Sequence, residues 1–536
     1  MNSRLFLYSS LFFVLILLFD ASSRSSSESL NKIENMNSIP ETTEKLERAG
    51  EQFPETIAND NKQAQSRIKH VDVITDTHKL KISLRDGSIV SAELLNYAKV
   101  FESTDNNVKL LNNIDQTYIA KTNVQSKDVV APNNYQTDVK SYDIGNNDFL
   151  EVVFKGETKD QVAIKKVYRF ERDSHLIKVE QIIQNLLPSI TTWRQYNTLE
   201  RGDDEEGNVM LYTYTGAAYY DEEDKFNKIE FSDIQDANFL KETSQAWISM
   251  IQHYFFTAWL PETNTQNKQT IYTRFSTNEH GETYLIGTVS DYKQILPGES
   301  FVFKSRLYVG PKDQAEIASL ADGLDLTVDY GVLTFLAAPL FWVLNKIFLI
   351  FGNWGWSIIA LTVLIKLLFF KLSETSYKSM AKMKKLTPRM NALKERFGDD
   401  RQKFSEALMK VYKEEKVNPL GGCLPILIQI PVFIALYWVL IESVEMRHAP
   451  FIWWIVDLSS SDPLYILPIL MGISMYVQQK LNPAPTDEMQ KKIFLALPFI
   501  FTFLFATFPS GLVLYWFTNN ILSIAQQYVI NKRALV

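Results

Sequence analysis

The chain has 536 residues, of which 62 are acidic and 55 basic, and its formal net charge is −7 at pH 7. This length is too great for one compact domain and predicts two or more units. Residues from about 28 to 320 are polar and acidic, whereas those from about 330 onward are dominated by Leu, Ile, Phe and Trp. The single cysteine, Cys423, excludes an intramolecular disulfide, and its apolar surroundings indicate a small buried hydrophobe.

The N-terminal residues 1–23 contain an apolar run, Leu5 to Phe19, which follows Arg4. A bilayer core needs about 20 residues, with roughly 17 as the lower limit, so the run is compatible with an uncleaved transmembrane signal anchor. A cleavable signal peptide is the alternative, because Ala21-Ser22-Ser23 resembles a cleavage site. Both interpretations export residues 24–66, whose Ser-, Glu- and Asn-rich composition predicts a flexible linker.

Residues 67–322 are predicted to form an exported all-β sandwich. Apolar and polar residues alternate with period two in segments such as Val71-Asp72-Val73 and Lys79 to Leu84, and turn residues such as Pro297-Gly298 separate the segments. Strands at this spacing, without intervening helices, indicate a large antiparallel sandwich.

The sequence of this predicted domain contains no recognisable catalytic or metal-binding motif. The acidic run Asp203 to Glu206 lacks the Gly-spaced Asp/Asn ladder of a calcium loop, so we interpret it as a solvated loop rather than a cation site. We therefore expect no enzyme activity, no metal and no cofactor. The histidines are scattered, and none has a metal-ligand spacing to another His or an acid: His70, His78, His175, His253 and His280.

Further apolar stretches follow the predicted sandwich. The last, Ile493 to Asn531, has 39 residues without a charge; as one helix it would extend about 58 Å, nearly twice the bilayer core. We predict two helices there, with a turn at Pro509-Ser510-Gly511. With the N-terminal anchor, the chain is predicted to cross the membrane six times. The other apolar stretches are Ile347 to Phe370, which contains Lys366, then Val417 to Ile441 and Pro463 to Gln479.

The distribution of charge agrees with this count if Arg4 lies inside. The loops Lys371 to Lys416 and Lys480 to Lys492 then lie inside, and the first of them is rich in Lys and Arg. The outer loop, Glu442 to Asp462, holds only Arg447 against its four acids. This is the positive-inside bias, and it places the C-terminus in the cytoplasm.

Two amphipathic elements flank the second predicted span. Residues 323–346 are predicted to contain an amphipathic helix on the outer membrane surface, with a plain extension of the span as the alternative. Residues 374–416 are predicted to form a helical hairpin in which the apolar seams Met383 to Phe397 and Phe404 to Val411 face each other. The basic outer faces of the hairpin either only orient the chain or bind an anionic partner such as ribosomal RNA or lipid headgroups.

Lys366 points most directly to a function, because it lies about 20 Å from the outer end of its predicted helix. A charge in mid-bilayer costs about 2.5–3.5 kcal/mol and usually faces a bundle interior or water, although Lys366 is also able to snorkel toward the inner headgroups. Thr362 and Ser373 lie on the same predicted face. The predicted spans contain no acid, which counts against an ion-coupled transporter. Other spans supply polar residues that line a hydrated cavity or join helices: Gln429, Gln478, Asn519, Asn520, Gln526 and Gln527.

Ordered motifs run through the C-terminal region: Gly352-Asn353-Trp354-Gly355, Ser379 to Met383, Glu415 to Cys423, Asp457-Leu458-Ser459, Tyr465 to Gly472 and Phe508 to Trp516. In this order they resemble the YidC family of membrane protein insertases. The predicted sandwich with its N-terminal anchor looks like the Gram-negative form of that family.

The resemblance implies a five-helix core over residues 347–536, with a hydrophilic groove open to the cytoplasm and to lipid. The positive residue of the family's groove, usually Arg, matches Lys366, which keeps the charge but lacks the planar donor fork. Family groove positions also match Phe433 and the pair Tyr515-Trp516, which departs from the more usual Tyr-Tyr. The expected substrate groove comprises Thr362, Lys366, Gln429, Phe433, Tyr515, Trp516 and Asn519.

The resemblance also implies insertion and folding of integral membrane proteins in the bacterial inner membrane, alone or with the Sec translocon. The implied partners are nascent membrane proteins, the Sec translocon with its SecDF accessory proteins, the lipid bilayer, and the ribosome through the basic hairpin. From the residues alone two rivals stay open: a polytopic solute transporter, and a carbohydrate-binding or carbohydrate-modifying exported domain on a membrane anchor. Solute flux in liposomes favours the first, and loss of activity on deletion of about residues 70–310 favours the second.

Overall fold

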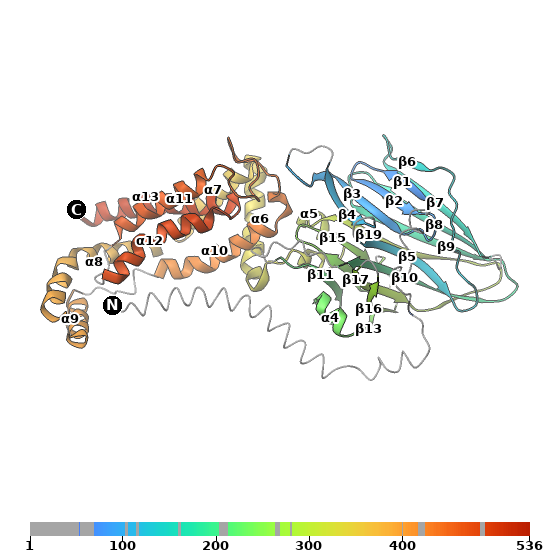
Figure 1. Cartoon of the computed structure of the whole chain (residues 1–536), viewed down its shortest axis with the longest axis horizontal. Helices are drawn as coiled ribbons and strands as arrows, with labels where there is room; N and C mark the ends of the chain where they lie inside the picture. Colours follow the sequence, from blue (N-terminus) through green and yellow to red (C-terminus); the bar gives the residue numbers. More distant parts are fainter. Residues whose placement is uncertain are drawn as a thin grey trace. The chain divides into compact units, whose positions relative to one another are not determined.

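The computed structural model describes residues 53, 69–101, 106–113, 117–158, 162–202, 213–262, 268–278, 281–398, 400–415, 424–482 and 488–535. The predicted anchor 1–23, the linker 24–66 apart from Phe53, the acidic run 203–206 and Cys423 lie outside the described residues. The chain divides into two compact units, residues 39–328 and a second unit that includes residues 329–536 (Figure 1).

The first unit is a sandwich of two sheets (Figure 1). The larger has 11 strands, in the order β13-β16-β17-β10-β5-β4-β3-β2-β1-β6 with β18 beside β10. These strands are β1 His70–Ile74, β2 His78–Ser83, β3 Ile89–Ala98, β4 Asn107–Asn112, β5 Tyr118–Ser126, β6 Ser141–Asp143, β10 Thr191–Gly202, β13 Leu240–Ser244, β16 Lys268–Asn278, β17 Gly281–Ser290 and β18 Lys293–Ile295.

The smaller sheet has eight strands, in the order β12-β11-β14-β15-β19-β9-β8-β7. Two short helices accompany the sandwich, α4 Phe231–Asp236 and α5 Gln314–Ile317, and a 3-10 turn, η2 Leu324–Thr327, ends the unit. The strands are β7 Phe149–Glu157, β8 Val162–Glu171, β9 Leu176–Asn185, β11 Gly216–Asp221, β12 Lys225–Ile229, β14 Trp247–Ile251, β15 Phe255–Leu260 and β19 Ser300–Pro311.

The predicted all-β sandwich is confirmed, and its period-two pattern has the expected cause. In β9, residues that face the other sheet, such as Val179 and Ile183, are buried, whereas their neighbours Lys178 and Gln184 are exposed. One pairing differs from an antiparallel sandwich: β6 pairs with β1 in parallel. A long connection after β5 brings the chain back to that edge, which permits the parallel direction.

The second unit is helical (Figure 1). The sequence places a helix over 323–346 and a span from Ile347; instead, one helix continues to Phe351, and the boundary prediction was wrong. Gly352, with φ +63°, ends α6 in the left-handed conformation, and the Asn353 side chain caps α7 by accepting from Trp356 N at 3.1 Å. The helices are η3 Gly331–Leu333, α6 Thr334–Phe351, α7 Trp354–Leu368, α8 Phe370–Phe397, α9 Arg401–Glu414, α10 Leu424–Glu442, η5 Val444–Met446, α11 Ile466–Leu481, α12 Glu488–Phe505 and α13 Ser510–Leu535.

A second break separates α7 from α8 at Phe369, where the two helices bend by 69°. The sequence suggested that Ser373 lies on the same helix as Lys366. Because of this bend, Ser373 instead belongs to α8, whereas Lys366 belongs to α7. Among the described residues, Gly331–Phe351 is long and apolar enough to cross a bilayer, and α7 with α8 counts as a second crossing only if the bent pair is one span. The six crossings and the interfacial position of residues 323–346 stay predictions.

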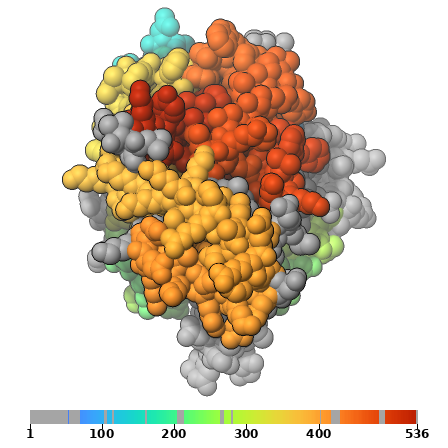
Figure 2. All heavy atoms as spheres, turned by 90° about the vertical axis from the view of Figure 1, so that its left-hand side faces the viewer, coloured from blue at the N-terminus to red at the C-terminus, as the bar shows by residue number. Residues whose placement is uncertain are grey.

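Two predictions about the remaining helices are confirmed. The long apolar run forms two helices, α12 and α13, which are separated by residues 506–509. The hairpin predicted over residues 374–416 forms from α8 and α9, seen in light to mid orange on the near side of Figure 2. Its seam buries Met390 against Leu408 and Tyr412. Arg389 joins the two helices through ion pairs with Glu414 and Glu415.

Candidate functional site: a polar cavity in the helical unit

A cavity of about 310 Å³ lies among the helices of the second unit. Side chains from α7, α8, α10, α11, α12 and α13 line it, so residues separated by up to 157 positions meet there. The lining residues are Lys366, Ser373, Ser376, Tyr377, Met380, Gln429, Ile430, Phe433, Met475, Gln478, Gln479, Asn482, Phe494, Leu497, Pro498, Tyr515, Trp516, Asn519, Asn520 and Ser523.

Lys366, in the last turn of α7, extends its ammonium group into this cavity. Its Nζ donates to Ser523 Oγ at 2.7 Å, and Ser523 Oγ donates to the Asn519 carbonyl at 2.7 Å. Lys366 is the single charged side chain among the described lining residues, and no described carboxylate pairs with it. A cation held by one hydroxyl keeps further N–H donors for a visiting group.

Most of the predicted groove residues gather around Lys366. Gln429 donates to the Asn519 side-chain carbonyl, and this bond joins α10 to α13. Phe433 lies edge-on to Trp516, with ring centroids 4.5 Å apart, and stacks on Tyr515 at 6.0 Å. Amides, a hydroxyl and an aromatic group thus all contribute to the lining of the cavity.

Thr362 is the exception among the predicted groove residues. Its hydroxyl donates to the Ile358 carbonyl of its own helix at 2.7 Å, and the residue is only 1 % exposed. It is absent from the lining of the cavity. Helical spacing placed Thr362 on the face of Lys366, but a threonine in a helix satisfies its hydroxyl locally, so it need not open a polar surface.

Several lining residues were missed in the sequence. Ser523 is the main one, because it directly accepts the hydrogen bond from Lys366. The sequence did contain an indication of Ser523, because this residue follows Asn519 by four positions and both therefore lie on one face of a helix. Ser376 and Tyr377 carried no such signal, because they reach the cavity only after the bend at Phe369.

The cavity offers hydrogen bonds rather than covalent chemistry. The lining residues that the structure describes present one cation, amides and hydroxyls, together with aromatic and aliphatic groups. The described residues contain no group of three or more His, Cys, Asp or Glu that could hold a metal ion. Such a site suits a polar or acidic segment that needs partners inside an apolar environment.

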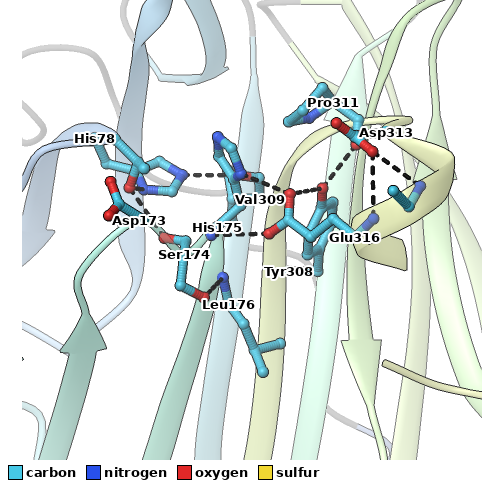
Figure 3. A network of polar contacts seen from close by, with 12 residues as sticks. His78, Asp173, Ser174, His175, Leu176, Tyr308, Val309, Pro311, Asp313 and Glu316 are labelled. Atoms are coloured by element: carbon cyan, nitrogen blue, oxygen red, sulfur yellow. Dashed lines mark hydrogen bonds and ion pairs between the residues drawn. The ribbon is translucent and has the colours of Figure 1, made fainter. Parts of the chain in front are cut away.

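The sandwich holds a second polar cluster, which the scattered histidines did not predict (Figure 3). His175 Nδ1 lies 2.9 Å from Glu316 Oε2, and the Tyr308 hydroxyl donates to the same oxygen at 3.2 Å. The His78 ring lies edge-on to His175 at 5.3 Å. Burial, with a smaller contribution from His175, lowers the pKa of His78 to about 4, so His78 is neutral at pH 7.

Glu316 fastens α5 to the start of β9 through this cluster. It also accepts from the His175 backbone N at 3.2 Å. Burial by itself would raise the pKa of Glu316, but the hydrogen bonds from His175 and Tyr308 outweigh it and hold the pKa below its ordinary value. The cluster therefore serves to stabilise the fold at this end of the sandwich.

Replacing Glu316 with alanine is expected to destabilise the sandwich by about 1.5–3 kcal/mol, because three donors lose a charged acceptor. Urea denaturation of the full chain, followed by hydrogen–deuterium exchange of β9 and β19, measures the change. Glu171→Ala is the matched control: Glu171 pairs with Lys178 on an exposed surface, where such pairs contribute about 0–1 kcal/mol. Equal effects of the two variants would contradict the assignment.

Both units match known protein families. Residues 70–343 match the family model described as YidC periplasmic domain, and residues 346–535 match the one described as 60Kd inner membrane protein. The chain belongs to the YidC family of membrane protein insertases. The sandwich is the family's periplasmic domain, and the protein is an inner membrane protein; the resemblance of the C-terminal motifs to this family is confirmed.

Similar proteins share nearly the full length of the chain. A membrane protein insertase YidC of Thioalkalivibrio sulfidiphilus is 46 % identical over 481 residues, which cover 88 % of this chain and 86 % of that protein. The YidC of Nitrosococcus oceani is 40 % identical over 552 residues and covers 99 % of both chains. A solved structure described as an active YidC insertase with its first transmembrane domain resolved is 17 % identical, covers 86 % of this chain and 94 % of its own, and has a TM-score of 0.39.

Proposed function

We propose that this chain is a membrane protein insertase and chaperone, which helps nascent proteins to enter and fold in the inner membrane. One structural observation supports the proposal independently of the family assignment. A polar cavity, with Lys366 as the one cation among its described lining residues, lies among helices whose outward side chains, such as Phe503 and Leu368, are apolar and exposed. A polar cavity inside an apolar surface is what an insertion route requires.

The proposed mechanism is physical rather than covalent. An apolar client segment carries polar flanks, and moving these flanks through hydrocarbon is costly. The cavity shortens the low-dielectric path, and the amides of Gln429 and Asn519 provide partners for the flank. Lys366 attracts an acidic flank. The apolar segment then moves sideways into lipid, driven by burial of its surface.

The remaining topology and partners belong to the same proposal. The chain crosses the inner membrane several times, with its C-terminus in the cytoplasm, in agreement with the positive-inside bias of the sequence. It works alone or with the Sec translocon and its SecDF proteins. The α8–α9 hairpin contacts the ribosome, supported by its exposed lysines, among them Lys382, Lys384 and Lys385.

Site-specific photocrosslinking to a stalled nascent membrane protein tests the proposal. A photoreactive side chain at Phe433 or Ile430, both in the cavity wall, is expected to crosslink the client several-fold more strongly than one at Trp342, which is exposed on α6. Trp342 is the matched control for non-specific contact with apolar segments. Equal crosslinking at all three positions, or none at the cavity, would contradict the insertion route.

A further inference from the structure

The outward face of the 11-stranded sheet carries an apolar cluster that would not be expected on a solvated surface. Tyr272 of β16 is 2 % exposed, and Leu285 and Val289 of β17 are 1 % and 3 % exposed. These three side chains pack with Phe53, itself 8 % exposed. Tyr196 and Leu240 complete the rim of the cluster.

The strand register assigns the cluster to the outward face. Thr122 of β5 points toward the smaller sheet, because Gln181 of β9 donates to its hydroxyl at 3.0 Å. Thr122 is opposite Asn197, which is opposite Thr288. Neighbours of these residues along each strand point the other way. Val289 and its partners are therefore on the face without a second sheet, where another part of the chain has to cover them.

Phe53 comes from the segment before the sandwich. It is the single aromatic residue in the sequence between Phe19 and His70, and Pro54 follows it. Its ring centroid lies 5.1 Å from that of Tyr272, and the Arg194 guanidinium carbon lies 5.9 Å from the ring centre. Arg194 is itself held in place, since its Nε donates to Gln125 Oε1 at 3.0 Å.

The sheet makes room for this contact. Tyr272 is opposite Gly287, and a Cβ at Gly287 would lie 2.6 Å from Tyr272 Cζ. Only glycine therefore lets the Tyr272 ring lie across β17. The Tyr272 hydroxyl is buried without a hydrogen-bond partner among the described residues. Burying a hydroxyl without a hydrogen bond costs free energy. A large apolar contact offsets this cost, and an aromatic ring provides such a contact.

We propose that the outward face of β10, β16 and β17 is a docking site for an aromatic side chain, and that its occupant is Phe53 of the chain's own N-terminal segment. The contact fastens this segment to the periplasmic domain. The segment that connects the first apolar run to the periplasmic domain is then attached to the domain at Phe53, before β1 begins at His70. Docking thus limits how far the domain moves from its N-terminal attachment.

Thiol labelling of the full chain tests the docking. With Cys423→Ala, the variant Val289→Cys places the single thiol beneath Phe53. Adding Phe53→Ala is expected to speed maleimide labelling of this thiol roughly 10- to 100-fold, the ratio that corresponds to exposing one buried aromatic side chain. Phe149→Ala, which truncates an exposed aromatic side chain on β7 of the other sheet, is the matched control and is expected to leave the rate unchanged.

Two further arms separate docking from a general loosening of the domain. A thiol from Ile286→Cys, which faces the other sheet and is fully buried, should stay slow whether or not Phe53 is present. A synthetic peptide of residues 46–60 should restore protection to the Phe53→Ala variant, and the same peptide with alanine in place of Phe53 should not. An unchanged rate at position 289 on Phe53→Ala, or equal acceleration at positions 286 and 289, overturns the proposal.

Discussion

Replacing Lys366 with glutamate is expected to reduce the insertion of small clients with acidic exported tails by about tenfold or more. Lys366 is the single charge among the described residues of the cavity wall, so the exchange turns attraction of an acidic flank into repulsion. A difference of about 1.4 kcal/mol already corresponds to a factor of ten, and charges at this depth cost about 2.5–3.5 kcal/mol. Lys366→Ala should give a smaller loss.

The measurement is protease protection of newly made clients in cells depleted of their own insertase and supplied with each variant. Lys366→Arg keeps the charge and should retain most activity. Lys346→Glu is the matched control, because Lys346 is exposed on α6 and outside the cavity. If cells with Lys366→Glu inserted all such clients normally, the attraction step would have to be abandoned, although the cavity could still serve as a passage.

The fold could be predicted from the sequence where a local period carries the information. Alternation in Lys79 to Leu84 predicted β2, and the length of Ile493 to Asn531 required the two helices α12 and α13. Neither pattern contains information on strand order. His78, His175 and Glu316 meet because the start of β2, the residue before β9 and the segment after β19 lie at one place, and nothing in their sequence spacing indicates this.

The candidate site was predictable to a similar extent. Polar residues in apolar helices are costly, so Lys366, Gln429 and Asn519 stood out, and all three line the cavity. Hydropathy does not show where a helix ends inside an apolar run, so the break at Phe369 was not foreseen. Whether these residues contact clients stays a prediction that crosslinking has to test.

Lys166→Glu is expected to have the largest effect on the stability of the periplasmic domain, about 3–5 kcal/mol. Lys166 of β8 is fully buried between the sheets. Its Nζ donates to the Asp86 carbonyl at 2.8 Å and to the Thr122 carbonyl at 2.7 Å. A carboxylate at this place would face two acceptors with no donor. Lys165→Glu is the matched control, because Lys165 is the exposed neighbour on the same strand.

The same lysine gives a pH dependence of known sign. Burial lowers the pKa of Lys166 to about 7, whereas the unfolded chain keeps an ordinary value near 10.5. Between these values the unfolded state holds a proton that the folded state has released, so the unfolding free energy rises with pH, by up to about 1.4 kcal/mol per unit. This contribution is complete above the unfolded pKa and is lost as the pH falls to about 7.

Hydrogen–deuterium exchange of β7, β8 and β9 in urea, measured on the full chain between pH 7 and 9.5, gives the slope. Lys166→Met should remove it while Lys165→Met keeps it, whatever the two substitutions do to the absolute stability. The slope distinguishes the hydrogen bonds of Lys166 from its titration. Loss of the hydrogen bonds changes the unfolding free energy equally at every pH, whereas the lowered pKa changes it only between the folded and unfolded pKa values. A wild-type slope that persists in Lys166→Met would assign the titration to another group.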